Sequence, residues 1–402
     1  MLKTIVDEEK IDEILSRGVD EIINKEHLRK RLLSGEKLRI KCGIDPTSPN
    51  LHLGRAVALL KLKDLQDLGH QIVLIIGDTT GVIGDTSDKD SERPMLTREI
   101  VQKNLATYKE QAGKILDMKK TEFHYNSEWL LKLGYNEIGE HADQFSLAEF
   151  IARENIKKRL EQGKRISLRE VLYPLMQGYD SGAIKADLEI GGTDQRFNLL
   201  AGRDLQKYFK QEVQDVLMVN LIEGIDGRKM SSSWSNTINI LDILNEMFGK
   251  IMSMPDDLII KYFIHCTRVQ IEKIKQMEIG MKNEKVNPRD AKLELATEIV
   301  KMYYDEKEAE KAKEYFINTF SKKEIPEEVK SQKLKVESIN IVELLASVNL
   351  ATSKNEARRL VEQGGVKVDG AVVKDINKII KITEKGSLIQ RGKRQFVRVI
   401  KG

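Results

Sequence analysis

The chain has 402 residues, of which 40% are hydrophobic and 32% are charged, with a formal net charge of +4. This length indicates two or three domains, the composition excludes a disordered chain, and no apolar run approaches the roughly 20 residues of a membrane span. The acidic, amphipathic N-terminus is not that of a signal or transit peptide. With two distant cysteines and six histidines at no paired spacing, we expect a cytoplasmic protein with neither a disulfide framework nor a protein-bound metal.

The charge is unevenly distributed along the chain. Residues 351–402 contain 13 Lys and Arg against 5 Asp and Glu, a net charge of +8, so the preceding 350 residues carry about −4. Such an asymmetry indicates a polyanionic partner for the C-terminal part. The alternative is a basic face that is simply solvated.

The first predicted strand–helix unit carries several polar residues at its turn. Residues 38–44 form an apolar run of strand length, and apolar residues recur at helical spacing from His52 until Gly69. The N-terminus of such a helix favours an anion. Gly54 would let a ligand lie on the backbone, and His52 and Arg55 share one helix face from which both can donate to phosphate. An ordinary βα turn with polar surface residues is the alternative.

The elements that follow predict an α/β fold. Residues 71–76 form a second buried strand, residues 96–160 are mostly helical and charged, and further strands are predicted at 183–190 and 213–219. A capping box, Ser167 to Glu170, opens a helix in which Pro174 predicts a kink or an early end. Strands that alternate with helices imply a Rossmann-like parallel sheet, whose ligands lie beyond the carboxyl ends of the strands.

The second half of the chain predicts two further domains. Strand signals vanish between residues 238 and 325, which indicates a helical bundle. The last 60 residues form a small α+β unit with a helix at 353–363. We expect a catalytic domain at 1–234 with a helical insertion at about 95–185, a helical domain at 235–325, a linker at 326–338 and a C-terminal module at 339–402.

A lysine and three serines follow the last predicted strand of the sheet, at residues 229–233 (KMSSS). An ammonium on a glycine-flanked loop is suited to closing over a triphosphate and neutralising the charge of a leaving group. A plain surface loop is the alternative for this segment alone. Together with the HLGR segment at 52–55, however, it resembles the paired signatures of class I aminoacyl-tRNA synthetases, which use them to bind ATP.

A third set of polar residues is suited to binding an amino acid. Tyr173, Gln177 and Asp180 lie on one face of a continuous helix, although ordinary helix packing is the alternative. Asp85, in the loop after the second strand, can pair with a substrate ammonium. The glycines of residues 191–195 (GGTDQ) permit close approach of a ligand, and Asp194 can accept from ribose hydroxyls.

Five segments, DPTSPNLHLG, IGDTSDKDSERP, YPLMQGYDS, ADLEIGGTDQRFN and KMSSS, together resemble the bacterial tyrosyl-tRNA synthetases. The resemblance covers essentially the whole chain, since residues 339–402 resemble the αL RNA-binding module of those enzymes. It implies a homodimer, formed through the insertion, that activates L-tyrosine with ATP carrying Mg²⁺ and charges tRNA(Tyr).

The resemblance also assigns roles to individual residues. It implies that the substrate ammonium is held by Asp85, Tyr173 and Gln177, the carboxylate by Gln195 and the phenolic hydroxyl by Asp180. ATP would lie along Asp45, Thr47, His52, Gly54 and Met230, with its ribose at Gly192 and Asp194 and its phosphates under Lys229 and Ser232. Transfer RNA would contact Lys354, Arg358 and Arg359 in the helix of the C-terminal module.

Three departures from the family pattern bear on these roles. Arg55 replaces the usual second histidine of the first signature, and Ser232 replaces a frequent second lysine. Lys41 stands where many relatives carry a tyrosine that reads the substrate hydroxyl, and it either reaches the phenol or points away from it. A tryptophanyl-type synthetase and a non-catalytic RNA-binding paralogue are the rival interpretations.

Overall fold

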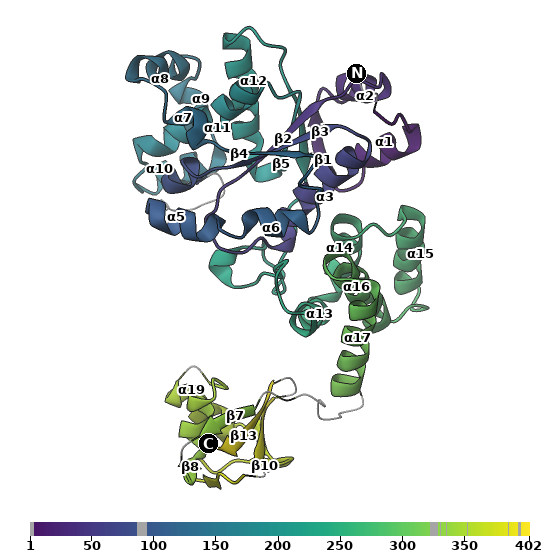
Figure 1. The fold of residues 1–402 in the computed structure, drawn as a ribbon, viewed down its shortest axis with the longest axis vertical. Helices are drawn as coiled ribbons and strands as arrows, with labels where there is room; N and C mark the ends of the chain where they lie inside the picture. The colour runs from purple at the N-terminus through teal and green to yellow at the C-terminus, as the bar shows by residue number, and fades with distance from the viewer. Residues whose placement is uncertain are drawn as a thin grey trace. The chain divides into compact units, whose positions relative to one another are not determined.

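A six-stranded sheet forms the centre of the first of two compact units, Met1–Glu310, in the computed structural model of the chain (Figure 1). The structure describes residues 4–86, 95–321, 329, 331–334, 336–351, 353–384, 386–392 and 395–402. The sheet order is β1-β6-β5-β2-β3-β4. The strands are β1 (Val19–Ile23), β2 (Arg39–Ile44), β3 (Gln71–Ile76), β4 (Thr121–Tyr125), β5 (Leu188–Gly192) and β6 (Asp215–Val219).

The four inner strands are parallel, as the α/β pattern predicts. β2 pairs in parallel with both β3 and β5, and β5 pairs in parallel with β6. Residues 72–76 and 215–219 are fully buried along their length, which is typical of strands covered by helices on both faces. The carboxyl ends of these strands therefore meet at one edge of the sheet.

The two edge strands and one strand boundary differ from the sequence predictions. β1 pairs antiparallel with β6, so the sheet is not parallel throughout. β4 lies inside the expected insertion and pairs with β3. The strand predicted at 183–190 begins only at Leu188, because residues 168–184 form one helix that ends at Lys185 in the left-handed conformation.

Helices cover the sheet and supply the segments that surround its carboxyl edge. Figure 1 shows α8, α9 and α10 grouped at one side of this unit, next to α11. The helices of the sheet region are α1 (Glu8–Ile14), α2 (Lys25–Leu33), α3 (Leu53–Asp67), α4 (Thr80–Ile83), α5 (Arg98–Leu105), α6 (Tyr108–Gly113), α7 (Ser127–Leu130), α8 (Tyr135–Ala142), α9 (Leu147–Ile151), α10 (Glu154–Glu161), α11 (Leu168–Ile184) and α12 (Arg196–Tyr208).

α11 is the helix that carries the third set of predicted residues. Its predicted capping box is present, and the helix runs through Pro174 for 17 residues rather than ending early. It packs closely on α12, since a Cβ at Gly178 would lie 2.9 Å from the backbone of Ala201. This close approach fixes the face of α11 that points to the strand ends.

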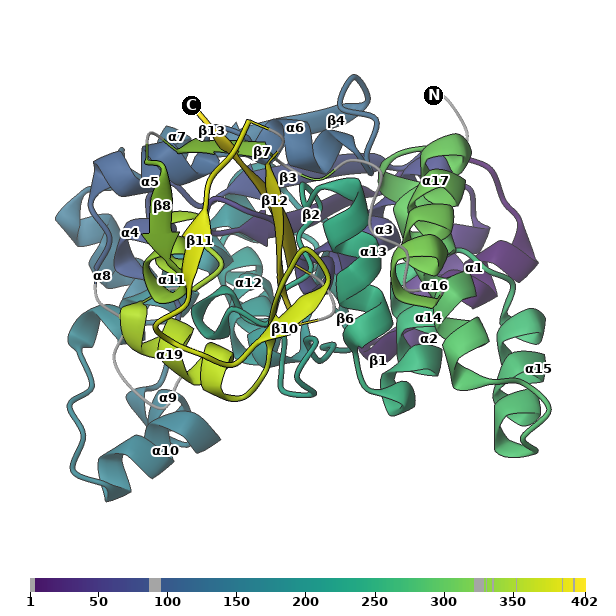
Figure 2. The same cartoon turned by 90° about the horizontal axis from the view of Figure 1, so that it is seen from below.

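The helical region that was predicted after residue 238 is present. Its helices, shown in Figures 1 and 2, are α13 (Leu244–Ser253), α14 (Ile259–Cys266), α15 (Ile271–Lys282), α16 (Pro288–Tyr303) and α17 (Glu306–Phe316). The Arg17 guanidinium joins the N-terminal segment to the end of α14, because it donates to the carbonyls of Phe263, Ile264, Thr267 and Val269 at 2.9–3.0 Å.

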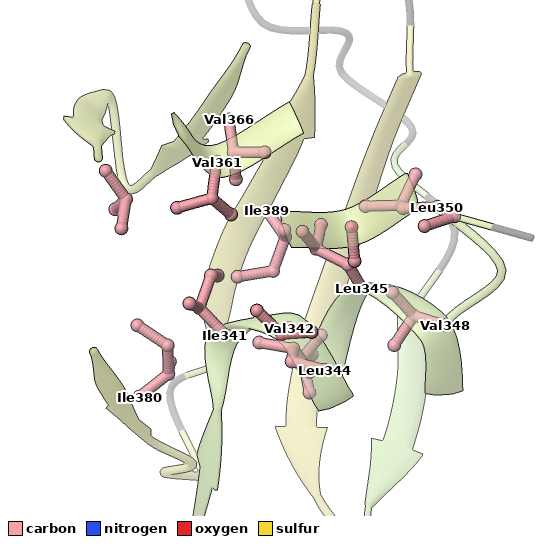
Figure 3. Packing of buried hydrophobic residues seen from close by; sticks show 14 of the residues in the cluster. Ile341, Val342, Leu344, Leu345, Val348, Leu350, Val361, Val366, Ile380 and Ile389 are labelled. Carbon is pink, nitrogen blue, oxygen red and sulfur yellow. The ribbon is translucent and has the colours of Figure 1, made fainter. Parts of the chain in front are cut away.

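The second unit, Lys311–Gly402, is a small α+β fold with its own core. Its main sheet has the order β10-β9-β12-β13-β7, and β11 pairs with β8. Its elements are β7 (Ser331–Leu334), β8 (Ser338–Asn340), α18 (Ile341–Ser347), α19 (Lys354–Glu362), β9 (Val366–Val368), β10 (Ala371–Val373), β11 (Ile379–Lys381), β12 (Ser387–Arg391) and β13 (Gln395–Lys401). Figure 3 shows apolar residues of α18 packed against Val361, Val366 and Ile389.

The predicted linker at 326–338 requires a correction. Residues 331–334 form β7, which pairs in parallel with β13 and so belongs to the C-terminal sheet. The polar composition of this segment concealed the strand, because β7 is an edge strand with alternating exposed residues.

Among the described residues, no helix is both long enough and apolar enough to cross a membrane.

We expect Arg17→Met to lower the free energy of unfolding by about 3 kcal/mol, because it removes four charge-assisted hydrogen bonds to main-chain carbonyls at the end of α14. Urea unfolding, monitored by circular dichroism, measures this loss in the free energy of unfolding. The matched control is Lys282→Met, which removes an exposed pair with Glu278 on α15 and should change stability by less than about 1 kcal/mol. Equal effects of the two variants would contradict the role given to Arg17.

Candidate active site

A cavity of about 410 Å³ opens at the carboxyl edge of the parallel strands. It is lined by residues of all three predicted sets, which come from β2, α3, α11, β5 and the loop after β6. Of the residues predicted to bind tyrosine or ATP, the cavity is lined by Asp45, Thr47, His52, Gly54, Arg55, Asp85, Tyr173, Gln177, Asp180, Gly192, Asp194, Gln195, Lys229, Met230 and Ser232. Lys41 is the exception.

The first signature segment is held in place by polar side chains of α3, α5 and α6. Arg55 donates to the Asp45 carbonyl at 2.9 Å and to the Thr47 hydroxyl at 3.0 Å. Gln111 accepts from the Leu51 N–H at 2.7 Å, and the Tyr108 hydroxyl donates to the Ser48 carbonyl at 2.5 Å. The guanidinium of Arg55 therefore fixes the loop while it also borders the cavity.

His52 precedes α3 and lies against the cavity as a neutral side chain. Burial, followed by the neighbouring charges of Arg55 and Lys229, lowers the pKa of His52 to about 3. Its Nδ1 atom is buried and has no hydrogen-bond partner among the described residues. A neutral imidazole of this kind can donate one hydrogen bond to a ligand without adding a charge. A side chain at Gly54 would meet His52, since its Cβ would lie 3.0 Å from Nδ1.

The two signature segments converge on this cavity. The backbone of Leu51 and Leu53 pairs with Ile240 and Ile238 through hydrogen bonds of 2.9 Å. The Gly54 N–H donates to the Met230 sulfur at 3.3 Å, and the hydroxyls of Ser48 and Ser232 lie 3.1 Å apart. The two segments, which are far apart in the sequence, are therefore in contact at the cavity.

Lys229 and Asp194 form an ion pair at the mouth of the cavity. The Lys229 ammonium lies 3.1 Å from the Asp194 carboxylate, and both side chains are partly exposed. Asp194 follows Gly192, which ends β5. A cation and an acceptor thus face the same space from opposite sides, an arrangement that fits phosphates and ribose hydroxyls.

Two carboxylates, the buried Asp180 and the partly buried Asp45, line the cavity near α11. Tyr173 donates to Asp45 at 2.8 Å, and burial raises the pKa of Asp45 to about 6. Asp180 accepts from the Trp129 indole at 2.7 Å and from the Asn126 amide at 3.4 Å. Burial raises the pKa of Asp180 to about 7, although the Lys41 charge and these two donors oppose the shift.

A second chain of hydrogen bonds fixes the residues predicted for the substrate amine and carboxylate. Gln195 donates to Asp85 at 2.7 Å and accepts from Asn198 at 3.0 Å. These bonds orient the Gln195 amide and the Asp85 carboxylate together at the cavity wall. Ser87 to Pro94, the rest of the DTSDKDSERP motif, lie outside the described residues.

Lys41 does not line the cavity, which favours the alternative in which it does not reach the phenol. Its ammonium is fully buried. It lies 2.9 Å from the Glu189 carboxylate, 2.8 Å from the Ser181 hydroxyl and 2.9 Å from the main-chain carbonyl of Gln177. It therefore does not read a substrate hydroxyl directly.

Lys354, Arg358 and Arg359, which were predicted to bind RNA, are exposed on α19 in the second unit. Lys354 is paired with Glu343 at 2.6 Å. The pair is itself exposed, and such surface pairs hold weakly. The three side chains are therefore placed where a polyanion could reach them.

Sequence reasoning missed the residues that support the site from the expected insertion. Asn126 and Trp129 bind Asp180, while Tyr108 and Gln111 hold the first signature loop. No spacing rule marks these residues, because their partners lie far away in the sequence. The only signal was polar residues on the buried side of helices.

Two family models match the chain in succession. The model for "tRNA synthetases class I (W and Y)" matches residues 33–321, and the model for the "Tyrosine--tRNA ligase SYY-like C-terminal domain" matches residues 322–399.

Individual relatives agree with these matches. The chain is 47% identical to "Tyrosine--tRNA ligase 2" of Clostridium acetobutylicum, over 96% of this chain and 97% of the relative. It is also 47% identical to "Tyrosine--tRNA ligase" of Thermotoga maritima, over 97% of both chains. The fold is similar to that of the tyrosyl-tRNA synthetase from Archaeoglobus fulgidus, with a TM-score of 0.61 at 23% identity over 76% of this chain and 100% of that chain. The chain therefore belongs to the class I tRNA synthetases of the tryptophan and tyrosine group and, within them, to the tyrosine–tRNA ligases.

Proposed function

We propose that the cavity catalyses tyrosine activation with the residues assigned above. The tyrosine carboxylate attacks the α-phosphorus of ATP, and pyrophosphate leaves as its magnesium complex. The resulting tyrosyl-adenylate then acylates the terminal adenosine of tRNA(Tyr). The observation that carries this proposal is the convergence of the HLGR and KMSSS segments on one cavity at the carboxyl edge of the sheet.

The chemistry needs no covalent nucleophile from the protein. It needs donors at the places where negative charge develops, and a fixed geometry for the two substrates. His52 supplies a neutral donor and Lys229 supplies a cation. The dipole of α3 favours negative charge at its N-terminus. ATP binding would exchange the Lys229–Asp194 pair for phosphate contacts to Lys229 and ribose contacts to Asp194. Arg55 acts mainly by holding Thr47 and the Asp45 backbone.

The tyrosine side of the cavity is formed by α11 and the loop that carries Asp85. The ammonium would be held by Asp85, by the Tyr173 hydroxyl oxygen and by Gln177. Asp180 would accept from the phenolic hydroxyl. This buried acceptor also favours tyrosine over tryptophan as the substrate, because an indole places no hydroxyl there.

We further propose a homodimer, a tRNA site and a cytoplasmic location. Large apolar side chains are exposed in the 95–185 segment, which supports dimerisation there; they include Leu131, Tyr135, Leu147, Leu160 and Leu168. The net charge of +8 in residues 351–402 supports binding of tRNA to the second unit. Two buried, free cysteines fit a reducing compartment.

We expect His52→Ala and Lys229→Ala each to lower the rate of adenylation by about 10²–10³, since each removes one donor to the developing charge. Tyrosine- and ATP-dependent exchange of labelled pyrophosphate measures the rate, and tyrosine affinity should change little. The matched control is Arg228→Ala, whose cation is adjacent in sequence, is paired with Asp226 and does not line the cavity. Equal losses in tyrosine affinity would contradict the assignment, and an inactive parent chain would refute the catalytic proposal.

We expect Asp180→Ala to abolish most of the discrimination between tyrosine and phenylalanine, because a buried acceptor no longer goes unpaired when the hydroxyl is missing. The ratio of kcat/KM for the two amino acids in the exchange assay measures it. Trp129→Phe keeps the carboxylate and should retain most of the selectivity. Full rejection of phenylalanine by Asp180→Ala would assign the selection to another group.

We expect tyrosine to bind more tightly as the pH rises through about 7, the value to which burial raises the pKa of Asp180. The ionised carboxylate is the better acceptor for the hydroxyl, so at lower pH binding must displace a proton. Between pH 6 and pH 8 the dissociation constant should fall by up to about tenfold. Equilibrium dialysis of labelled tyrosine measures this change. The same pH dependence in Asp180→Asn would show that another group titrates.

A further inference from the structure

A buried ion pair lies at the wall of the cavity, where Glu189 is a lining residue and Lys41 is not. The side chains of Lys41 and Glu189 are 0% and 1% exposed, and their charged atoms lie 2.9 Å apart. The ammonium also donates to the Ser181 hydroxyl at 2.8 Å and to the main-chain carbonyl of Gln177 at 2.9 Å. These partners match the three N–H groups of the ammonium, so Lys41 is fully engaged.

Glu189 links this ion pair to the cavity wall. Its Oε1 atom accepts from Lys41 and from the Gln177 amide at 3.3 Å, and its Oε2 atom accepts from Ser181 at 3.0 Å and Gln214 at 2.6 Å. Every partner is a donor, which is what an ionised carboxylate requires. Removal of the lysine would leave this carboxyl buried without its counter-charge and with one donor fewer.

The charge on Glu189 determines which way the Gln177 amide faces. An ionised carboxylate can only accept, so the NH₂ group of Gln177 must point to Glu189. The NH₂ group and the oxygen of a side-chain amide are bonded to the same carbon and point in different directions. The side-chain oxygen of Gln177 is therefore turned away from Glu189. Gln177 lines the cavity, and that oxygen is the end that can accept from a substrate ammonium.

We propose that Lys41 is a positioning residue for the amino group of the substrate, acting through Glu189 and Gln177. Its positive charge keeps Glu189 an acceptor, Glu189 keeps the Gln177 amide in one orientation, and the Gln177 oxygen receives the ammonium. This inference rests on the proposed tyrosine site and assigns to Lys41 a role at the end of the substrate opposite to the hydroxyl.

The contacts of Lys41 favour this role over one at the phenol. Lys41 does not line the cavity, and both carboxylate oxygens of Asp180 bind other donors, Trp129 and Asn126. Lys41 acts on Asp180 by its charge alone. Asp180 and Cys42 are the other titratable groups that interact with Glu189, and neither can replace the lysine as a counter-charge.

The experiment compares the full chain with Lys41→Met and with Lys41→Met/Glu189→Gln. The single variant leaves Glu189 without its counter-charge, whereas the double variant removes both charges and keeps a side-chain oxygen at position 189 that can face the Gln177 NH₂. Two competitive inhibitors of tyrosine-dependent pyrophosphate exchange test the binding of the substrate's ammonium and of its carboxylate separately. Tyramine carries the ammonium and the phenol, and 3-(4-hydroxyphenyl)propionate carries the carboxylate and the phenol.

We expect Lys41→Met to weaken the binding of tyramine and to raise the KM for tyrosine by roughly 10- to 100-fold. This range corresponds to the loss of one hydrogen bond to a charged group. The affinity for 3-(4-hydroxyphenyl)propionate should fall by a smaller factor, which reports the loss of the Lys41 charge that lowers the pKa of Asp180. The kcat of exchange should change far less than the KM. The double variant should recover most of the tyramine affinity, which also shows that the loss in the single variant is not a folding defect.

Three results would overturn the proposal. Equal weakening of both inhibitors would place the effect at the phenol or in the fold. Tighter binding of tyramine would show that Glu189 attracts the ammonium by its charge. A double variant as weak as the single one would exclude the amide orientation as the cause. Failure of the proposed function is distinguishable, because the unaltered chain would then show no tyrosine-dependent exchange.

Discussion

The backbone pairing of residues 51–53 with residues 238–240 is the constraint on which the active site depends. These segments are far apart in the sequence, yet hydrogen bonds of 2.9 Å join Leu53 to Ile238 and Ile240 to Leu51. The pairing places the N-terminus of α3 beside the loop that carries Met230. A helix dipole, a neutral histidine and a lysine then act on one small volume. Without this pairing, each signature would be a polar surface segment with little chemical meaning.

The cavity is built on polar groups that are buried but satisfied. Asp180 and Glu189 lie out of solvent and Asp45 is partly buried, and each accepts hydrogen bonds from side chains of other elements. Burying a carboxyl costs free energy unless donors surround it. The raised pKa values of Asp45 and Asp180 show that this cost is only partly offset. Such groups are held ready for a substrate that brings the missing donors, and this readiness makes discrimination by a single hydroxyl or ammonium possible.

The 95–185 segment supports the cavity from two places and also carries exposed apolar side chains. Its first helices fix the loop at 46–51 through Tyr108 and Gln111, and its later residues Asn126 and Trp129 fix Asp180. Large apolar side chains of the same segment are exposed. If these form the proposed dimer interface, association of two chains would stabilise residues that directly support the substrate site. An insertion that a sequence pattern marks only as helical and charged is thus part of the active site.

The sequence by itself determined the order of the main elements and pointed to most of the residues that line the cavity. Local patterns are sufficient for this, because a buried strand such as residues 71–76, a capping box at Ser167 and a cap at Asn287 are encoded by neighbouring residues. The paired signatures supplied the family, since their residue types follow from the chemistry of ATP. Only the tertiary structure decided the rest: the edge strands β1, β4 and β7, the supports of Asp180 and the direction of Lys41. Each of these depends on a partner that lies far away in the chain, and a side chain with several competing partners takes its orientation from the packing that brings them together.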